Sequence, residues 1–176
     1  LSNGWRNIYF CGLKVFSYKR AYPFENNNKS NFVLDIGGLL QINSTCKISD
    51  GCVLQNAPGD TIKIGKNTIL KPYAILCGDI TIGDNVIIDQ NVVISTLGYD
   101  FCQVGKPMNT AECIKNPSIN IQNDVWIGAN TTVAPGINIG CGAVIYPNSF
   151  VNSDIPAYAI VGGCPAHVID SRLSHI

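Results

Sequence analysis

The sequence predicts an all-β solenoid, a three-sided prism built from stacked coils. Three observations support this prediction. Small apolar residues recur every six positions, a second small or apolar residue follows each of them four positions later, and Gly or Asn stands just past several of them. A period of six matches neither the 3.6-residue repeat of a helix nor the plain alternation of a strand. It matches two inward-pointing residues followed by a tight corner.

The repeat is clearest between residues 121 and 156. The six-residue series there is Ile121, Ile127, Val133, Ile139, Ile145 and Val151. The partners four positions later are Val125, Thr131, Ile137, Ala143, Ser149 and Ile155. Gly128, Gly140 and Asn152 stand at corners where we expect φ > 0, which Gly and Asn tolerate. A β-sandwich of short strands is the alternative, but it would not keep one register over so many repeats.

The same repeat extends toward the N-terminus. Its middle part comprises Ile64, Leu70, Leu76, Ile82, Ile88 and Ile94, with partners Thr68, Ala74, Ile80, Val86 and Val92. Its first part comprises Ile36, Ile42, Ile48 and Leu54, with partners Leu40, Cys46, Cys52 and Pro58. A short insertion at residues 58–63 breaks the step. About sixteen such units, three to a turn, predict about five coils stacked at the usual inter-strand spacing of about 4.8 Å.

Four segments follow from this pattern. Residues 1–33 lack the repeat, and we expect them to cap the open first coil. Residues 34–156 form the prism, and residues 157–176 are expected to close its last coil. Residues 98–117 fit no repeat unit, so they predict a long loop extruded from the prism. A loop of this kind is usually functional, although a tolerated surface insertion is the alternative.

Composition excludes several classes of protein. The chain is 46% apolar and only 14% charged, and its formal net charge is zero, so nothing indicates binding to nucleic acid or an anionic membrane. No apolar run approaches the ~20 residues that span a bilayer. Residues 8–13 are too short, and too closely flanked by Arg6 and Lys14, for a signal peptide. The eight cysteines include no C-x-x-C pair, so we expect packing thiols, no metal site and a cytoplasmic protein.

Three stretches carry a resemblance to a known family. VVISTLGYDF opens the loop, PSINIQNDVWIGANTTVAPGINIG re-enters the prism, and DIPAYAIVGGCPAHVI ends it. Together with the repeats, residues 34–173 resemble the hexapeptide-repeat acetyltransferases, in particular the maltose, galactoside and xenobiotic O-acetyltransferases and their sugar-modifying relatives. The resemblance implies a left-handed parallel β-helix that works as a homotrimer. Acetyl-CoA, as co-substrate, and a small acceptor such as a sugar or nucleotide-sugar would meet in clefts between neighbouring prisms.

The resemblance also identifies catalytic candidates, with one departure. The family's catalytic base is a histidine at the mouth of the loop, but residues 95–100 read STLGYD, so Tyr99 stands in its place. Acyl transfer to a hydroxyl needs a base whose pKa is near neutral, whereas an ordinary tyrosine has a pKa of about 10. The catalytic candidates are therefore Tyr99, Asp100 beside it, and Asp89 on the coil below.

Binding candidates follow from the same motifs. The resemblance places the pantetheine of CoA along the corners of the last coils, with Arg172 near a phosphate. The cofactor-binding candidates are Gly128, Ala129, Pro147, Asn152, Ser153 and Arg172. The substrate-binding candidates are Cys77, where the family often has an aspartate, and Trp126. Oxyanion contacts in this family come largely from backbone N–H groups, which side-chain changes need not remove.

Three interpretations stay open at this point. The first is an active acyltransferase acting on a hydroxyl or an amine. The second is a catalytically silent relative that serves as a structural or binding module, because Tyr99 replaces the histidine. The third is another enzyme on the same prism. A zinc carbonic anhydrase needs three histidine ligands, and His167 and His175 in the tail are the only two histidines. An ice-binding prism needs ladders of threonine, and the sequence has none.

Overall fold

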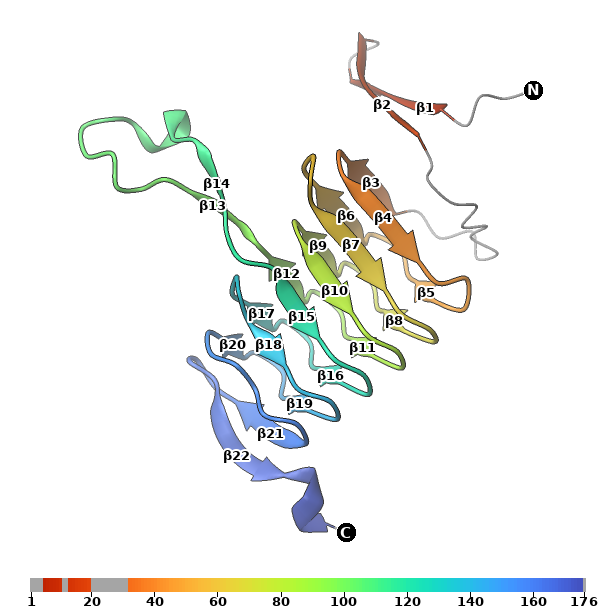
Figure 1. Cartoon of the computed structure of the whole chain (residues 1–176), viewed down its shortest axis with the longest axis vertical. Coiled ribbons are helices and arrows are strands. Elements are labelled where there is room, and N and C mark those ends of the chain that lie inside the picture. Colours follow the sequence, from red (N-terminus) through yellow and green to blue (C-terminus); the bar gives the residue numbers. More distant parts are fainter. Residues whose placement is uncertain (1–4, 11–12, 20–31, 176) are drawn as a thin grey trace.

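The protein is a three-sided prism of stacked coils from which one long arm projects (Figure 1). The computed structural model describes residues 5–10, 13–19 and 32–175. In these ranges every regular element is a β-strand or a short 3-10 helix, and no helix is long and apolar enough to cross a membrane. The predicted parallel β-helix with an extruded loop is thereby confirmed.

Three sheets form the faces of the prism. The six-stranded face contains β3 (Val33–Ile36), β6 (Val53–Asn56), β9 (Ile75–Cys77), β12 (Val93–Ser95), β17 (Thr132–Val133) and β20 (Phe150–Val151). The five-stranded face contains β4 (Leu39–Ile42), β7 (Thr61–Ile64), β10 (Ile80–Ile82), β15 (Ile119–Ile121) and β18 (Asn138–Ile139). The seven-stranded face contains β5 (Lys47–Ile48), β8 (Ile69–Leu70), β11 (Ile87–Ile88), β16 (Trp126–Ile127), β19 (Val144–Ile145), β21 (Ala159–Gly162) and β22 (His167–Ser171).

The chain visits the faces in a fixed order. Each coil runs from the six-stranded face to the five-stranded face and then to the seven-stranded face. We name the three corners between them edge 1, which follows the six-stranded face, edge 2, which follows the five-stranded face, and edge 3, which follows the seven-stranded face. Two faces have six parallel strands, so the prism has about six coils and not five. The extra rung is β21, which lies in the segment expected only to close the prism and pairs in parallel with β19.

Aliphatic side chains fill the interior as the repeat predicts. The members of the two main series and their partners between residues 64 and 155 are all buried. Ile82 is typical, since it is 1% exposed and lies between Ile64 and Ile121 of the neighbouring rungs. One inward residue was predicted wrongly: Pro58 is exposed in the insertion, and Ile62 fills the interior in its place.

The corners use their glycines differently from the prediction. Gly128, Gly140 and Asn152 do not have positive φ; the left-handed residues after Gly128 and Gly140 come two positions later, at Asn130 (φ 59°) and Gly142 (φ 71°). Gly128 and Gly140 are needed for close approach between coils. A Cβ on Gly128 would lie 2.6 Å from the Pro147 nitrogen, and a Cβ on Gly140 would lie 2.4 Å from the Ala157 nitrogen. Both distances are too short for any side chain.

The two ends of the chain are built differently from the prism. At the C-terminus, β22 pairs antiparallel with β21, and a 3-10 helix, η2 (Arg172–His175), follows it. Near the N-terminus, β1 (Trp5–Phe10) and β2 (Leu13–Lys19) form an antiparallel hairpin. The remaining residues of the predicted cap, 1–4, 11–12 and 20–31, lie outside the described part. Capping by residues 1–33 stays a prediction.

Three of the predicted packing thiols are buried and protonated. Burial raises the pKa of Cys46, Cys52 and Cys77 above the ordinary value. Cys46 and Cys52 also donate their S–H groups to the Gly65 and Lys71 carbonyls, at 2.8 and 3.2 Å. Of the other described cysteines, Cys102, Cys113 and Cys164 are exposed and Cys141 is half-buried.

This difference predicts a labelling pattern. A raised pKa lowers the thiolate fraction at pH 8, and only the thiolate reacts with iodoacetamide. We expect the native protein to be alkylated at the exposed cysteines at least about tenfold faster than at the buried three, which should react only in urea. Peptide mass spectrometry after timed quenching measures these rates. Fast native labelling of Cys52 would contradict the placement of its side chain in the interior.

Candidate active site

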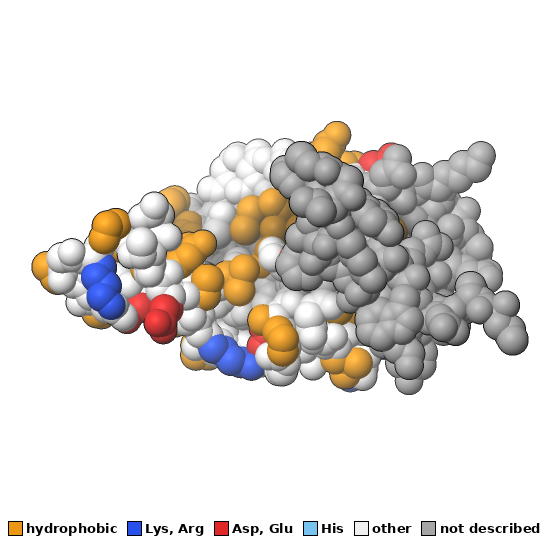
Figure 2. All heavy atoms as spheres, turned by 90° about the horizontal axis from the view of Figure 1, so that it is seen from above, with side chains coloured by type: hydrophobic (Ala, Val, Ile, Leu, Met, Phe, Trp, Pro, Cys, Tyr) orange, Lys and Arg blue, Asp and Glu red, His pale blue; other side chains and the backbone are white. Residues whose placement is uncertain are grey.

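The projecting arm contains the position where the catalytic histidine was expected. It leaves edge 1 after β12 and returns at β15, and its stem is an antiparallel pair, β13 (Leu97–Tyr99) with β14 (Cys113–Lys115). A 3-10 helix, η1 (Met108–Thr110), lies at its far end. Apolar and charged side chains mix on the surface of the arm (Figure 2). Val104, near the tip, is 98% exposed, so the arm presents apolar groups that this chain alone does not cover.

Tyr99 and Asp100 stand together at the top of the stem. Tyr99 pairs with Cys113 and is 57% exposed, so its ring is not packed into the interior of the prism. Asp100 accepts a hydrogen bond from the Cys102 N–H at Oδ1 (3.0 Å) and one from Gln103 Nε2 at Oδ2 (2.7 Å). Both carboxylate oxygens are therefore engaged in a turn of the arm. Such local bonds are typical of an aspartate that shapes a loop.

Asp89 is held differently, on edge 3. Trp126 Nε1 donates a hydrogen bond of 2.8 Å to Asp89 Oδ2, and the Asp89 N–H donates to the Ile127 carbonyl at 3.0 Å. The carboxylate is thus oriented by an indole from the next coil. Donation to an ionised carboxylate is a strong, directional contact. Among the described residues, none donates a hydrogen bond to Oδ1 of Asp89, whereas both carboxylate oxygens of Asp100 accept one.

Three of the cofactor candidates continue along edge 3. Gly128 and Ala129 follow β16, and Pro147 occupies the corner of the next coil. The Gly128 N–H already donates to the Ile145 carbonyl (2.8 Å), and the Ala129 carbonyl accepts the Asn148 N–H (2.9 Å). Gly128 therefore contributes a smooth, close-packed corner and not a spare donor. Asp89 lies one coil above these residues, since the Asn130 N–H donates to the Gln90 carbonyl.

The remaining binding candidates lie elsewhere. Asn152 and Ser153 are exposed on edge 1, whereas Arg172 packs against edge 2. Arg172 forms an ion pair with Asp124 (2.9 Å) and donates to the Gly142 carbonyl (2.9 Å). Cys77 is buried at the end of β9, with its thiol 3.7 Å from Gln55 Oε1. The predicted site residues are thus distributed over three edges, and a single chain does not bring them together.

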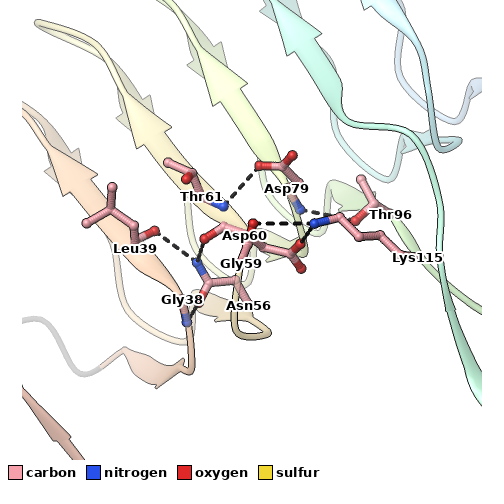
Figure 3. A network of polar contacts seen from close by, with 9 residues as sticks. All are labelled: Gly38, Leu39, Asn56, Gly59, Asp60, Thr61, Asp79, Thr96 and Lys115. Atoms are coloured by element: carbon pink, nitrogen blue, oxygen red, sulfur yellow. Dashed lines mark hydrogen bonds and ion pairs between the residues drawn. The ribbon is translucent and has the colours of Figure 1, made fainter.

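A polar network at the base of the arm was not anticipated from the sequence (Figure 3). Lys115, on the returning limb, forms an ion pair of 2.6 Å with Asp60, which belongs to the insertion in the second coil. Asn116 donates to the Thr96 carbonyl (2.9 Å), which joins the two limbs of the arm. The only signal in the sequence was that insertion and loop both interrupt the repeat, which gave no reason to connect them.

The described residues contain no group of three or more His, Cys, Asp or Glu side chains that could hold a metal ion. His167 begins β22 and lies beside Gly163, at the edge-3 end of the seven-stranded face, whereas His175 lies in η2. His175 Nε2 lies 3.0 Å from Asp170 Oδ2, and His167 Nδ1 lies 3.5 Å from the Pro165 carbonyl.

Known proteins match the chain at the level of sequence. The family described as bacterial transferase hexapeptide (six repeats) matches residues 61–96, and this repeat implies a left-handed coil. Galactoside O-acetyltransferase from Escherichia coli (strain K12) is 36% identical over 118 residues, which cover 63% of this chain and 54% of that protein. A putative acetyltransferase, YJL218W, from Saccharomyces cerevisiae is 30% identical over 159 residues, covering 89% of this chain and 78% of that protein. The chain spans only about half of the Escherichia coli protein.

Solved structures match the fold. A maltose O-acetyltransferase from Clostridium difficile 630 has a TM-score of 0.55 and 26% identity, covering 81% of this chain and 68% of that chain. AntD, an N-acyltransferase from Bacillus cereus solved with dTDP and 3-hydroxybutyryl-CoA, has a TM-score of 0.64 and 22% identity, covering 79% and 77%. At that identity the likeness to AntD concerns the fold alone.

Proposed function

Because the chain belongs to the hexapeptide-repeat acetyltransferase family, we propose that it transfers an acetyl group from acetyl-CoA to a hydroxyl or amine of a small acceptor. Galactoside and maltose O-acetyltransferases among its relatives support a sugar as acceptor. Buried free thiols suit a reducing compartment, so we place the reaction in the cytoplasm.

The observation that carries the proposal, and that indicates where the reaction takes place, is the distribution of the candidate site residues over separate edges of the prism. The arm with Tyr99 leaves edge 1, whereas Asp89, Trp126 and the smooth corner at Gly128 lie on edge 3. A second prism beside the first would bring the arm of one copy to edge 3 of its neighbour. Three copies related by a three-fold axis close such a heterologous contact, and they also cover the apolar groups of the arm. We therefore propose a homotrimer with its sites between chains.

In this arrangement Asp89 is the base that we favour. Its Oδ2 is fixed by Trp126, whereas both oxygens of Asp100 are engaged in the arm. The acceptor oxygen or nitrogen attacks the thioester carbonyl carbon while its proton passes to Asp89. The C–S bond then breaks, and the proton returns to the departing sulfur of CoA. Tyr99 of the neighbouring arm orients the acceptor through its hydroxyl. A carboxylate is a weaker base than histidine, which favours an amine acceptor that arrives neutral.

This proposal makes a prediction for Asp89. Wild-type protein should bind acetyl-CoA in calorimetry, sediment as a trimer at micromolar concentration and acetylate at least one of galactosides, maltose or a dTDP-linked amino sugar. Asp89→Asn should lower kcat about 10²-fold or more, within the usual range for loss of a general base. Product should be followed by mass spectrometry, because exposed cysteines would react with thiol reagents. Asp84→Asn, on edge 2 of the same coil, is the matched control and should keep its turnover.

The competing function is that of a silent relative, and Tyr99 in place of the family's histidine favours it. A trimer that neither binds acetyl-CoA nor acetylates any acceptor would support a structural or binding role. Binding of acetyl-CoA with full activity in Asp89→Asn would instead reject Asp89 as the base and leave the acyltransferase proposal in place.

A further inference from the structure

We infer that Lys115 and Asn116 are positioning residues, which fix the arm to the prism and thereby set the location of Tyr99. The catalytic consequence of this inference rests on the proposed function, whereas the anchoring of the arm does not. The contacts that carry it lie at edge 1, where the arm leaves and re-enters the prism, and Figure 3 shows those of Lys115.

The anchor begins with the insertion in the second coil. Leu54 and Ile62 are eight positions apart, whereas Leu76 and Ile80, which pair with them in the third coil, are only four apart. Four extra residues therefore stand on edge 1 of the second coil, and they end at Asp60. Asp60 is 6% exposed although it is a carboxylate. A buried carboxylate without a partner is unfavourable, so its partner has a structural role.

That partner is Lys115, which comes from the arm. Its Nζ lies 2.6 Å from Asp60 Oδ1 and 3.3 Å from the Gly59 carbonyl, so the insertion supplies two acceptors to one ammonium group. The hydrogen bond with Asp60 raises the pKa of Lys115, and Asp79 of the third coil adds to this effect. The short corner of the third coil lets Lys115 reach past it to the second. Most exposed ion pairs contribute little to stability, but one partner here is buried.

The outgoing limb of the arm is connected to the same corner of the prism, edge 1. Asn116 Nδ2 donates to the Thr96 carbonyl at 2.9 Å, and Thr96 Oγ1 accepts the Asp79 N–H at 3.1 Å. Asp79 Oδ1 in turn accepts the Thr61 N–H at 2.9 Å, directly after Asp60. Both limbs are thus connected through one network to the second and third coils. Lys115 also pairs with Leu97 at the foot of the stem, two residues before Tyr99.

The sequence offers a matched control inside the arm. Lys106 Nζ lies 2.6 Å from Gln103 Oε1, and both residues belong to the arm. Lys106→Met and Lys115→Met remove the same charge from the same loop, but only the second breaks a contact with the prism. Lys115→Arg keeps a cation that can reach Asp60 and serves as the conservative rescue.

The test is amide hydrogen exchange of residues 97–115, followed by mass spectrometry, together with steady-state kinetics. In Lys115→Met the stem should exchange about tenfold faster than in the wild type while the prism coils keep their protection. Its kcat should fall about tenfold with the KM for acetyl-CoA within about twofold, because a misplaced group slows chemistry more than binding. Lys106→Met should match the wild type in both measurements, and Lys115→Arg should recover most of both.

If the stem of Lys115→Met exchanged at the wild-type rate, the inference that Lys115 anchors the arm would be overturned. If the stem exchanged faster but kcat stayed unchanged, the catalytic part of the inference would be overturned. If Lys115→Met fails to fold because Asp60 is left unpaired, the double variant Asp60→Asn/Lys115→Met removes both charges and should show the same fast exchange. If the wild type acetylates nothing, the proposed function fails while the exchange result still decides the anchoring.

Discussion

Replacing Ile82 by Asp should cost several kcal/mol of the free energy of unfolding, a large fraction of the about 5–15 kcal/mol available to a domain. Ile82 is 1% exposed in the middle of the five-stranded face, with Ile64 and Ile121 directly above and below it. Among the described residues, the interior that the new carboxylate would enter is formed mainly by aliphatic side chains, with no cation to pair with it. Its desolvation would have no compensating hydrogen bond, so the charge would be strongly unfavourable.

The neighbouring position provides the control. Thr81 is exposed on the outer side of the same strand, and its partner in the previous rung is Lys63. Thr81→Asp should therefore change stability by less than about 0.5 kcal/mol. Urea unfolding followed by circular dichroism compares the two variants. Equal midpoints would mean that the side chains of β10 are not oriented as described.

Tyr99→Phe should lower kcat ten- to a hundredfold in an active enzyme, about the loss expected when a group that orients the reacting acceptor is removed. The KM for acetyl-CoA should stay nearly constant, because the hydroxyl acts on the acceptor. Tyr158→Phe removes the hydroxyl of another exposed tyrosine, at edge 2, and should have no effect on turnover.

Tyr99→His complements this measurement. It places a histidine, the base that the family resemblance implies, at the top of the stem, where the side chain is 57% exposed and has room for the smaller ring. Turnover in Tyr99→His where the wild type has none would identify the natural protein as a silenced relative. Undiminished activity in Tyr99→Phe would instead reduce Tyr99 to a surface residue of the arm. The base would then have to be sought at Asp89 alone.

The interior of the prism could be predicted from the sequence because its geometry repeats. Once Ile121 and Ile127 point inward, every later position in step with them must do so as well, and the burial of residues such as Val133 and Val151 follows. The insertion at residues 58–63 could be located, but its conformation could not. Extending the six-residue repeat predicts Pro58 in the interior, whereas the extra residues shift the inward position to Ile62.

The candidate site could be predicted only in part, because its residues do not repeat. Periodicity shows which corner a residue occupies but not which partners its side chain finds. The bond between Trp126 and Asp89 links residues 37 positions apart, and the pair of Lys115 and Asp60 joins two separate interruptions of the repeat. Neither contact has a signal in a single sequence.

The way the arm is inserted into the prism determines how freely its length and composition can change. Ile94 and Ile119, at the two ends of the interruption, pair with Leu76 and Ile80, which are four positions apart in an uninterrupted coil. The prism therefore fixes both ends of the arm at the distance of a tight corner, whatever lies between them. Closing a longer loop across that distance costs only about 0.6 kcal/mol of chain entropy for each doubling of its length. Edge 1 can thus accept arms of different length and composition while the coils stay folded, so the arm can change independently of the scaffold.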